Sequence, residues 1–359
     1  MAGKGCNNTE GLSYLVLDSR SASVWVTSSL TTVLQPTTIA LGNFDGIHGG
    51  HARVIGPVVE AARALNQQER DPILDDRTEN GTQGLALEQV RPTVVSFYPH
   101  PQVVLRGIDR AALTPTDEKA RCLQRLGVEQ LVLLPFNQSL RQLSPEAFLE
   151  QILLEQLQGR MIAVGEDFRF GRGRAGTAIA LRDLAAKFGV PVTIVSLETA
   201  GGDRISSSRI RDCLATGDVH TVHQLLGRPY ELTGRVVKGQ QLGRTLGFPT
   251  ANLQVEADKL LPRFGVYGVR AVLESGDSES GETVGGVMNV GCRPTVAGQA
   301  PTVEVHLFDW SGDLYGQVLT VHLMGFIRPE RAFDSLEALK AQITQDCLTA
   351  RDQVAIACS

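Results

Sequence analysis

The run from Ala40 to His51, ALGNFDGIHGGH, constrains the fold of this chain more than any other feature. The apolar, β-branched residues 37–41 predict a buried strand, and the apolar spacing that follows predicts an amphipathic helix over residues 51–65. Two glycines flank the turn between these elements. A strand, a glycine turn and a helix N-terminus bind phosphate, because free backbone N–H groups and the helix dipole face the anion. We expect such a site here, with His48 and His51 as side-chain donors.

Strands and helices alternate between residues 37 and 200, which favours a Rossmann-like parallel sheet wrapped by helices. The expected strands are residues 37–41, 93–97, 130–134, 161–165 and 190–196, and the expected helices are residues 51–65, 116–126, 145–156 and 178–188. Beyond residue 228, strand-like runs and glycine turns predict a small antiparallel β-barrel with a terminal helix over residues 335–350. Its expected strands are residues 231–237, 266–273, 284–290, 303–309 and 318–326.

These patterns divide the chain into four segments. Residues 1–35 are expected to be a loose N-terminal extension. Residues 36–204 form the α/β domain, interrupted by an acidic surface insertion at 67–90. Residues 205–228 form a helical connection, and residues 229–359 form the β domain.

Composition excludes several classes of protein. The net charge of -5 gives no positive field that would attract nucleic acid. Six cysteines without a Cys-x-x-Cys pair indicate reduced thiols, and so a cytoplasmic location. No apolar run is long enough to span a membrane, and the N-terminus lacks the pattern of a signal peptide.

Three shorter strings in the first half suggest ligand contacts. Tyr-Pro-His-Pro at residues 98–101 follows a predicted strand, where open α/β sheets bind ligands. Ile-Ser-Ser-Ser-Arg-Ile-Arg at residues 205–211 caps a helix with hydroxyls that can donate to phosphate. Residues 165–177 contain a Gly-x-Gly-x-x-Gly run at 171–176, with Glu198 at a distance suited to ribose binding.

Two alternative interpretations arise from these motifs. The Gly-x-Gly-x-x-Gly run is typical of dinucleotide-dependent oxidoreductases, although it begins well past the predicted strand and two arginines would crowd a pyrophosphate. The His-x-x-His pair also fits helix capping or a zinc site, for which Asp45 is the one further ligand nearby.

The second half contains a glycine-rich string, GQQLGRTLGFPTAN, at residues 239–252. Its glycines allow the backbone to approach phosphates, and Thr250 and Asn252 offer oxygens suited to Mg²⁺. A plain glycine-rich hairpin is the alternative. Glu304 lies in an alternating strand, where its carboxylate is either solvated or a general base.

In their order along the chain, these strings resemble the prokaryotic bifunctional riboflavin kinase/FAD synthetase family. For the α/β domain, the resemblance implies ATP contacts by Gly42, Asn43, Phe44, Gly46, Ser206, Ser207 and Ser208, catalytic roles for His48, His51 and Arg211, and flavin contacts by Asp167, Phe168 and Arg169. For the β domain, it implies ATP contacts by Gly239, Gly243 and Arg244, Mg²⁺ binding by Thr250 and Asn252, flavin contacts by Arg293 and Arg328, and Glu304 as the catalytic base. Three positions depart from the family pattern: Gly49 replaces a larger apolar residue, Thr177 an aspartate and Ser208 a threonine.

The resemblance therefore implies a bifunctional enzyme that uses ATP and Mg²⁺. The barrel would phosphorylate riboflavin to FMN, and the α/β domain would convert FMN and ATP to FAD and pyrophosphate. Its partners would be these small molecules, with no nucleic acid or membrane, and the chain would be a monomer or weak homo-oligomer. Two rival functions are the oxidoreductase and a non-enzymatic flavin sensor that binds RNA through the arginines of residues 169–174.

Overall fold

The computed structural model describes residues 13–18, 21–68, 88–107, 109–196, 199–200, 203–239, 242–273, 282–295 and 298–356. The chain divides into two units, one made of Met1–Arg110 and Thr116–Arg204 and the other of Ala111–Pro115 and Ile205–Ser359. We call them the α/β unit and the barrel unit, and describe each by itself.

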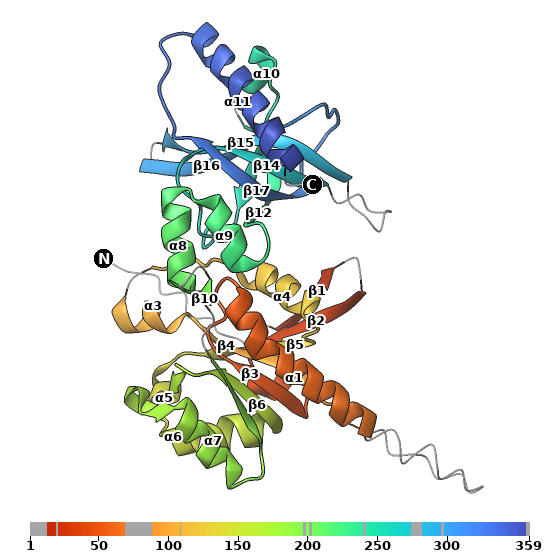
Figure 1. Cartoon of the computed structure of the whole chain (residues 1–359), viewed down its shortest axis with the longest axis vertical. Coiled ribbons are helices and arrows are strands. Elements are labelled where there is room, and N and C mark those ends of the chain that lie inside the picture. Colours follow the sequence, from red (N-terminus) through yellow and green to blue (C-terminus); the bar gives the residue numbers. More distant parts are fainter. Residues whose placement is uncertain are drawn as a thin grey trace, which may run out of the picture. The chain divides into compact units, whose positions relative to one another are not determined.

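The α/β unit is built on a seven-stranded sheet with the order β1-β2-β5-β4-β3-β6-β9 (Figure 1). The strands are β1 (Ser13–Asp18), β2 (Ser21–Thr27), β3 (Thr37–Leu41), β4 (Arg91–Tyr98), β5 (Gln130–Pro135), β6 (Gly159–Gly165) and β9 (Val192–Val195). All neighbours pair in parallel except β1 and β2. The chain runs outward from β3 to one side through β4 and β5, and to the other through β6 and β9. Ligands of open α/β sheets bind where the order reverses in this way, at the carboxyl ends of β3 and its neighbours.

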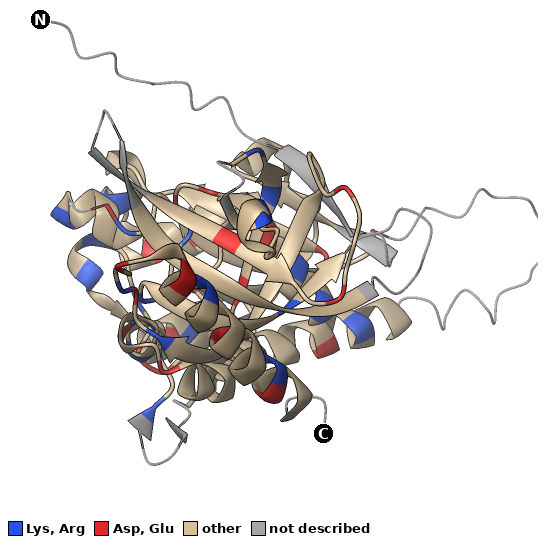
Figure 2. Ribbon diagram, turned by 90° about the horizontal axis from the view of Figure 1, so that it is seen from above, with Lys and Arg blue, Asp and Glu red and all other residues tan. Residues whose placement is uncertain are grey.

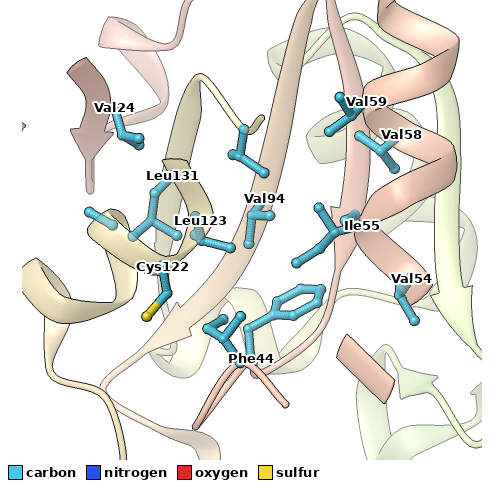
Figure 3. Close-up of a cluster of buried hydrophobic side chains, with 14 of the residues drawn as sticks. Val24, Phe44, Val54, Ile55, Val58, Val59, Val94, Cys122, Leu123 and Leu131 are labelled. Atoms are coloured by element: carbon cyan, nitrogen blue, oxygen red, sulfur yellow. The ribbon is translucent and has the colours of Figure 1, made fainter. Parts of the chain in front are cut away.

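Helices cover both faces of this sheet and enclose two cores. On one face, α1 (Gly49–Gln68) and α4 (Thr116–Arg125) pack their apolar side chains, such as Ile55 and Leu123, against Val94 of β4 (Figure 3). On the other face, α6 (Pro145–Ala147) continues into a π-helix at Phe148–Gln156, which packs with α7 (Ala178–Ala186). The prediction of a helix over residues 145–156 is therefore right in position, but most of it has π rather than α geometry.

Short elements complete the α/β unit. They are α3 (Pro101–Arg106), α5 (Gln138–Gln142), the 3₁₀ turns Leu30–Thr32 and Arg172–Arg174, and two hairpins, β7 (Arg169–Phe170) with β8 (Gly176–Thr177) and β10 (Thr199–Ala200) with β11 (Asp203–Arg204).

The prediction of a loose extension over residues 1–35 is wrong for Ser13–Asp18 and Ser21–Thr27, which form two strands of the sheet. Val24 and Val26 of β2 are fully buried in the core, and β2 pairs in parallel with β5. The alternation of β-branched residues at these positions supplies the buried face of a strand. Residues 1–12 of the expected extension and residues 69–87 of the expected insertion lie outside the described residues.

The barrel unit is a closed antiparallel barrel with the strand order β12-β13-β16-β15-β14-β17. The strands are β12 (Glu231–Val237), β13 (Ala251–Val255), β14 (Gly265–Leu273), β15 (Glu282–Thr295), β16 (Gly298–Leu307) and β17 (Val318–Arg328). The sequence patterns missed β13, a short strand that begins two residues after the proline of the glycine-rich string. The helices are α8 (Ser207–Thr216), α9 (Val219–Leu226), α10 (Leu242–Leu246) and α11 (Leu336–Ile356).

The long helix α11 packs on the outer face of the barrel, against β14, β15 and β17. Ala350 of α11 is fully buried in a small core with Val266, Val287 and Phe308. This packing covers part of the outer barrel surface with apolar side chains.

Basic and acidic residues are both scattered over the ribbon in Figure 2. Every helix among the described residues is too short or too polar to cross a bilayer.

Candidate active sites

The turn after β3 lies at the carboxyl edge of the sheet and has an unusual backbone. Phe44 and Ile47 have φ angles of 47° and 42°, and Gly46 has a φ of 97°, all in the left-handed region. Two hydrogen bonds hold the turn to β4: Gly42 N–H donates to the Val95 carbonyl at 3.1 Å, and the Ser96 hydroxyl donates to the Asn43 carbonyl at 2.9 Å. Strained backbone of this kind persists only where its surroundings fix it, and it occurs often at ligand sites.

The side chain of Phe44 packs into the core next to this turn. Its ring is 1% exposed and belongs to the core with Ile55 and Val94 (Figure 3). A ring in that position cannot stack on a nucleotide, so a contact between Phe44 and ATP would have to come from its backbone. The implied ATP contact by Phe44 therefore stays a prediction for its backbone.

The two histidines meet at the start of α1. Their rings are stacked, with centroids 3.7 Å apart and planes 15° apart, and His48 is buried. The His48 carbonyl accepts hydrogen bonds from the N–H groups of His51 and Ala52, at 2.8 and 3.1 Å. A Cβ added at Gly50 would lie 3.3 Å from the His48 ring, so a glycine suits this position. The pair stands at a helix N-terminus that follows a buried strand, which is the geometry the sequence predicted for phosphate.

A lysine that the motifs did not indicate also reaches this turn. Lys119, in α4, donates to the Asn43 carbonyl at 3.4 Å. Burial lowers the pKa of Lys119, and the nearby Asp45 carboxylate opposes that shift. Its sequence position gives no signal of a site, because Lys119 lies within an ordinary amphipathic helix. Only the strand order brings α4 beside the end of β3.

The alternative metal site is not supported. Within the residues that the structure describes, no group of three or more His, Cys, Asp or Glu side chains could hold a metal ion. The histidine pair with Asp45 therefore does not form a zinc site in this part of the chain.

The expected flavin-contacting segment forms the hairpin of β7 and β8. Asp167 makes an ion pair with Arg204, and both side chains are about half exposed. The rings of Phe168 and Phe170 stack at 5.8 Å, and a Cβ at Gly176 would lie 2.6 Å from the Phe170 ring. Arg169 is exposed on the same hairpin.

The geometry of this hairpin argues against the oxidoreductase interpretation. Gly171 and Gly173 belong to a 3₁₀ turn between two antiparallel strands and Gly176 begins the second strand, whereas a dinucleotide fingerprint joins a parallel strand to a helix. Gly176 is required for packing against Phe170, not for a pyrophosphate. Glu198 lies outside the described residues.

The serine-rich segment belongs to the barrel unit. Ser206 is the N-cap of α8, and its hydroxyl accepts from the Arg209 N–H at 3.3 Å. Ser207 and Ser208 form the first turn, and the half-buried Arg211 follows one turn later. Thr177, which replaces an aspartate of the family pattern, likewise caps α7 by accepting from Ala180 N–H at 3.0 Å.

The barrel unit contains a cavity of about 380 Å³ on its outer face beside α11. Five of the predicted site residues line it together: Gly243, Thr250, Asn252, Glu304 and Arg328. The remaining lining residues are Leu246, Phe248, Val266, Val287, Asn289, His306, Glu330, Arg331, Phe333, Leu339, Ile343 and Asp346. Arg244 is exposed and does not line the cavity. The Arg293 side chain lies outside the described part of the structure.

Strand register places Glu304 in the centre of a polar row. Glu304 pairs with Asn252 of β13 on one side and with Asn289 of β15 on the other. Residues directly opposite in an antiparallel pair have Cβ atoms about 5 Å apart on the same face. The neighbours Val303 and Val305 are buried inside the barrel, so Glu304 faces outward into the cavity. Glu304 therefore lies in the cavity wall, and its role as a general base stays a prediction.

The residues expected to hold Mg²⁺ sit in a tight glycine cradle. A Cβ at Gly239 would lie 2.3 Å from the Asn252 amide nitrogen, and a Cβ at Gly243 would lie 2.3 Å from the Phe248 carbonyl and 3.3 Å from the Thr250 hydroxyl. Backbone can approach this closely only without a side chain. The hydroxyl and amide oxygens are hard ligands of the kind Mg²⁺ accepts, so the residues present fit that ion.

Arg328, at the end of β17, is held by α11. Its guanidinium makes a two-edged ion pair with Asp346, with Nη2 to Oδ2 at 2.7 Å, and the cavity end beside it is lined by Phe333, Leu339 and Ile343.

Comparisons with known proteins agree with this division of the chain. A family model described as FAD synthetase matches residues 30–70 and 81–209, and one described as riboflavin kinase matches residues 226–354. A bifunctional riboflavin kinase/FMN adenylyltransferase of Escherichia coli K12 is 38% identical over 316 residues, covering 88% of this chain and 91% of that protein. The protein of the same description from Bacillus subtilis 168 is 35% identical over 317 residues, covering 86% and 90%.

A solved structure described as a macrolide-efflux protein from Streptococcus pneumoniae is also similar, with a TM-score of 0.74 and 28% identity, covering 89% of this chain and 96% of that one. The sequence relatives and both family models agree on the same two activities. This chain belongs to the family of bifunctional riboflavin kinase/FMN adenylyltransferases.

Proposed function

We propose that this chain makes FAD from riboflavin in two ATP-dependent steps, with the cavity of the barrel unit as the kinase site and the turn after β3 as part of the adenylyltransferase site. The observation that carries the proposal is the polar row of Asn252, Glu304 and Asn289, with Thr250 in the same cavity wall. The assignment of the two activities to this chain follows from its family. The roles of the individual residues are our proposal.

In the kinase step, Glu304 accepts the proton of the ribityl 5′-hydroxyl as that oxygen attacks the γ-phosphorus of ATP, and ADP leaves. A general base in this position typically accelerates a reaction about 10²- to 10⁴-fold. Thr250 and Asn252 would hold Mg²⁺, which when bound neutralises charge on the phosphate oxygens. The apolar end of the cavity at Phe333, Leu339 and Ile343 suits the flavin ring.

In the adenylyltransferase step, a phosphate oxygen of FMN attacks the α-phosphorus of ATP, and pyrophosphate leaves. No proton has to be removed from this nucleophile. The turn after β3 can stabilise the developing negative charge through its backbone N–H groups, through His48 and His51, and through Lys119. This arrangement relies on positioning and charge, without a covalent enzyme intermediate.

Three further expectations belong to this proposal. Cys122, Cys213, Cys292 and Cys347 are free thiols, as a reducing cytoplasm would keep them. The partners are the small molecules riboflavin, FMN and ATP, with no nucleic acid. The chain acts as a monomer or weak homo-oligomer.

One assay tests the function. The protein is incubated with riboflavin, ATP and Mg²⁺, and the flavins are separated by chromatography. We expect FMN first and FAD with pyrophosphate afterwards. An oxidoreductase would transfer hydride without consuming ATP, and a flavin sensor would bind riboflavin without turnover and bind RNA in a salt-dependent way. Either outcome would refute the proposal.

A further inference from the structure

We propose that Asp346, on α11, is a positioning residue of the kinase site that orients the guanidinium of Arg328 and compensates its charge, so that this end of the cavity accepts a neutral flavin ring. The inference rests on the proposed kinase function. It concerns a residue outside every motif that the sequence analysis identified.

The contact between Asp346 and Arg328 is geometrically complete. Arg328 Nε donates to both carboxylate oxygens, at 3.0 and 3.1 Å, and Nη2 donates to Oδ2 at 2.7 Å. The third nitrogen, Nη1, donates to the Pro329 carbonyl at 3.1 Å. Every nitrogen of the guanidinium is therefore held, which fixes the plane of this rigid fork.

A second residue of α11 braces the carboxylate. Gln342, one turn before Asp346, donates from Nε2 to Asp346 Oδ1 at 2.7 Å. Residues four apart lie on the same face of a helix, and Leu339 and Ile343 of that face line the cavity. The face of α11 toward the cavity thus combines apolar side chains with one buried carboxylate, that of Asp346.

The ion pair of Arg328 and Asp346 is buried, so the loss of either partner is costly. The side chains of Arg328 and Asp346 are 17% and 3% exposed. A buried charge that loses its partner is strongly unfavourable, so Arg328 without Asp346 would turn toward water or toward another acid. Glu330 and Glu304 line the same cavity and are the acids within it that could attract a released arginine.

The compensated charge bears on what this end of the cavity binds. Phe333 lies between Arg328 and Arg331, with guanidinium carbons 5.6 and 4.7 Å from its ring centre. Together with Val266, Val287 and Ile343, it forms an apolar wall. A fixed, charge-compensated guanidinium in an apolar wall suits a neutral, planar heteroaromatic ring, whereas the glycine cradle near Thr250 suits phosphate.

The variant that tests this role is Asp346→Asn, which preserves size but removes the charge and places an amide donor against the guanidinium. We expect the Kd and KM for riboflavin to rise about 10- to 100-fold, the range for hydrogen bonds to charged groups. The KM for ATP should change little, and so should FMN-to-FAD conversion by the same protein. Riboflavin binding is followed by quenching of flavin fluorescence.

A double-mutant cycle separates positioning from a general structural role. If Asp346 acts through Arg328, Asp346→Asn adds no further loss of riboflavin affinity to Arg328→Gln. The matched control is Asp309→Asn, which removes a different ion pair with α11, that of Asp309 with Arg351 at 2.8 Å, away from the cavity lining. It should leave the riboflavin Kd unchanged.

Several results would overturn the inference. An unchanged riboflavin Kd in Asp346→Asn would do so. The inference would also fail if the Kd of the double variant rose by the product of the two single-variant factors, or if Asp309→Asn lost as much affinity as Asp346→Asn. Should Asp346→Asn fail to fold, Gln342→Ala removes one bond to the carboxylate together with the bond that Gln342 accepts from Arg331. It must still raise the Kd, and no change there would also refute the role. A wild-type protein that makes no FMN would instead refute the kinase function itself.

Discussion

The turn after β3 and the cavity of the barrel unit differ in how far apart their residues lie in the sequence. The turn from Gly42 to His51 is one short run, and its shape depends on local backbone, with left-handed residues at Phe44, Gly46 and Ile47. The cavity instead gathers Thr250, Glu304 and Asp346 from three distant segments. A motif therefore suffices to recognise the first site, whereas the second depends on strand register and on the packing of α11.

The barrel site depends on the strand register. Glu304 faces the cavity because it pairs with Asn252 and Asn289, while Val303 and Val305 point inside. A shift of one residue would exchange the two faces and bury the carboxylate in the barrel. Variants in the two sites should therefore affect the two activities separately.

The largest effect is expected for Glu304→Gln. The kinase rate should fall about 10²- to 10⁴-fold because the general base is lost. FMN-to-FAD conversion should remain, since the turn after β3 is intact. Both rates are measured by chromatography from separate riboflavin and FMN starting points, with circular dichroism to verify the fold. Kinase turnover near the wild-type rate in a folded variant would remove Glu304 from this role.

The double variant His48→Ala with His51→Ala is the reciprocal test. We expect FAD formation to fall about 10²- to 10³-fold, because the two groups proposed to stabilise the leaving pyrophosphate are lost. FMN should then accumulate from riboflavin. If the folded double variant makes FAD at the wild-type rate, or loses FMN formation as well, the separation of the two sites is wrong.

Gly239→Ala tests the glycine cradle with a single added methyl group. That Cβ would lie 2.3 Å from the Asn252 amide, so Asn252 must move. We expect the kinase rate to fall about 10- to 100-fold, as small displacements at a reacting centre do. Gly56→Ala is the matched control, because nothing lies within 4 Å of that Cβ and it sits in α1. Equal kinase rates in the two variants would show that the cradle is not needed.

The smallest effect concerns stability. Asp218 caps α9 by accepting from the Thr221 N–H at 3.0 Å, so Asp218→Ala should lower the free energy of unfolding by about 1 kcal/mol. Each unit has one of the two tryptophans, Trp25 and Trp310, so single-tryptophan variants can report each unit by fluorescence. The Trp310 signal should show the loss.

The same cap gives a pH dependence with a defined sign. Hydrogen bonds from the Thr221 hydroxyl and backbone lower the pKa of Asp218. Its contribution is therefore complete above the ordinary aspartate pKa of about 4 and is lost as the pH falls through the lower, folded value. The stability difference between wild type and Asp218→Ala should shrink in acid. Asp218→Asn, which retains a capping oxygen, should lose less at neutral pH.

The sequence by itself determined both motifs and most of the helices and strands. The strands at residues 37–41 and 231–237 were predicted with the bounds that the structure has, because a glycine closely follows each of them. Residues 13–18 and 21–27 were missed despite the alternation of Val24 and Val26, and β13 was missed because a strand of five residues shortly after a proline carries little periodic signal. The sequence pattern named Phe44 as an ATP contact but did not show that its ring fills the core under the turn.

Only the tertiary structure brought Lys119 to the turn after β3 and Asp346 to Arg328. Both residues lie on ordinary amphipathic helices, and their partners are distant in the chain. Periodicity shows which face of a helix is apolar, but not which strand end that face will meet. That choice depends on strand order and register, which are set by the packing of the whole unit and not by any local run of residues.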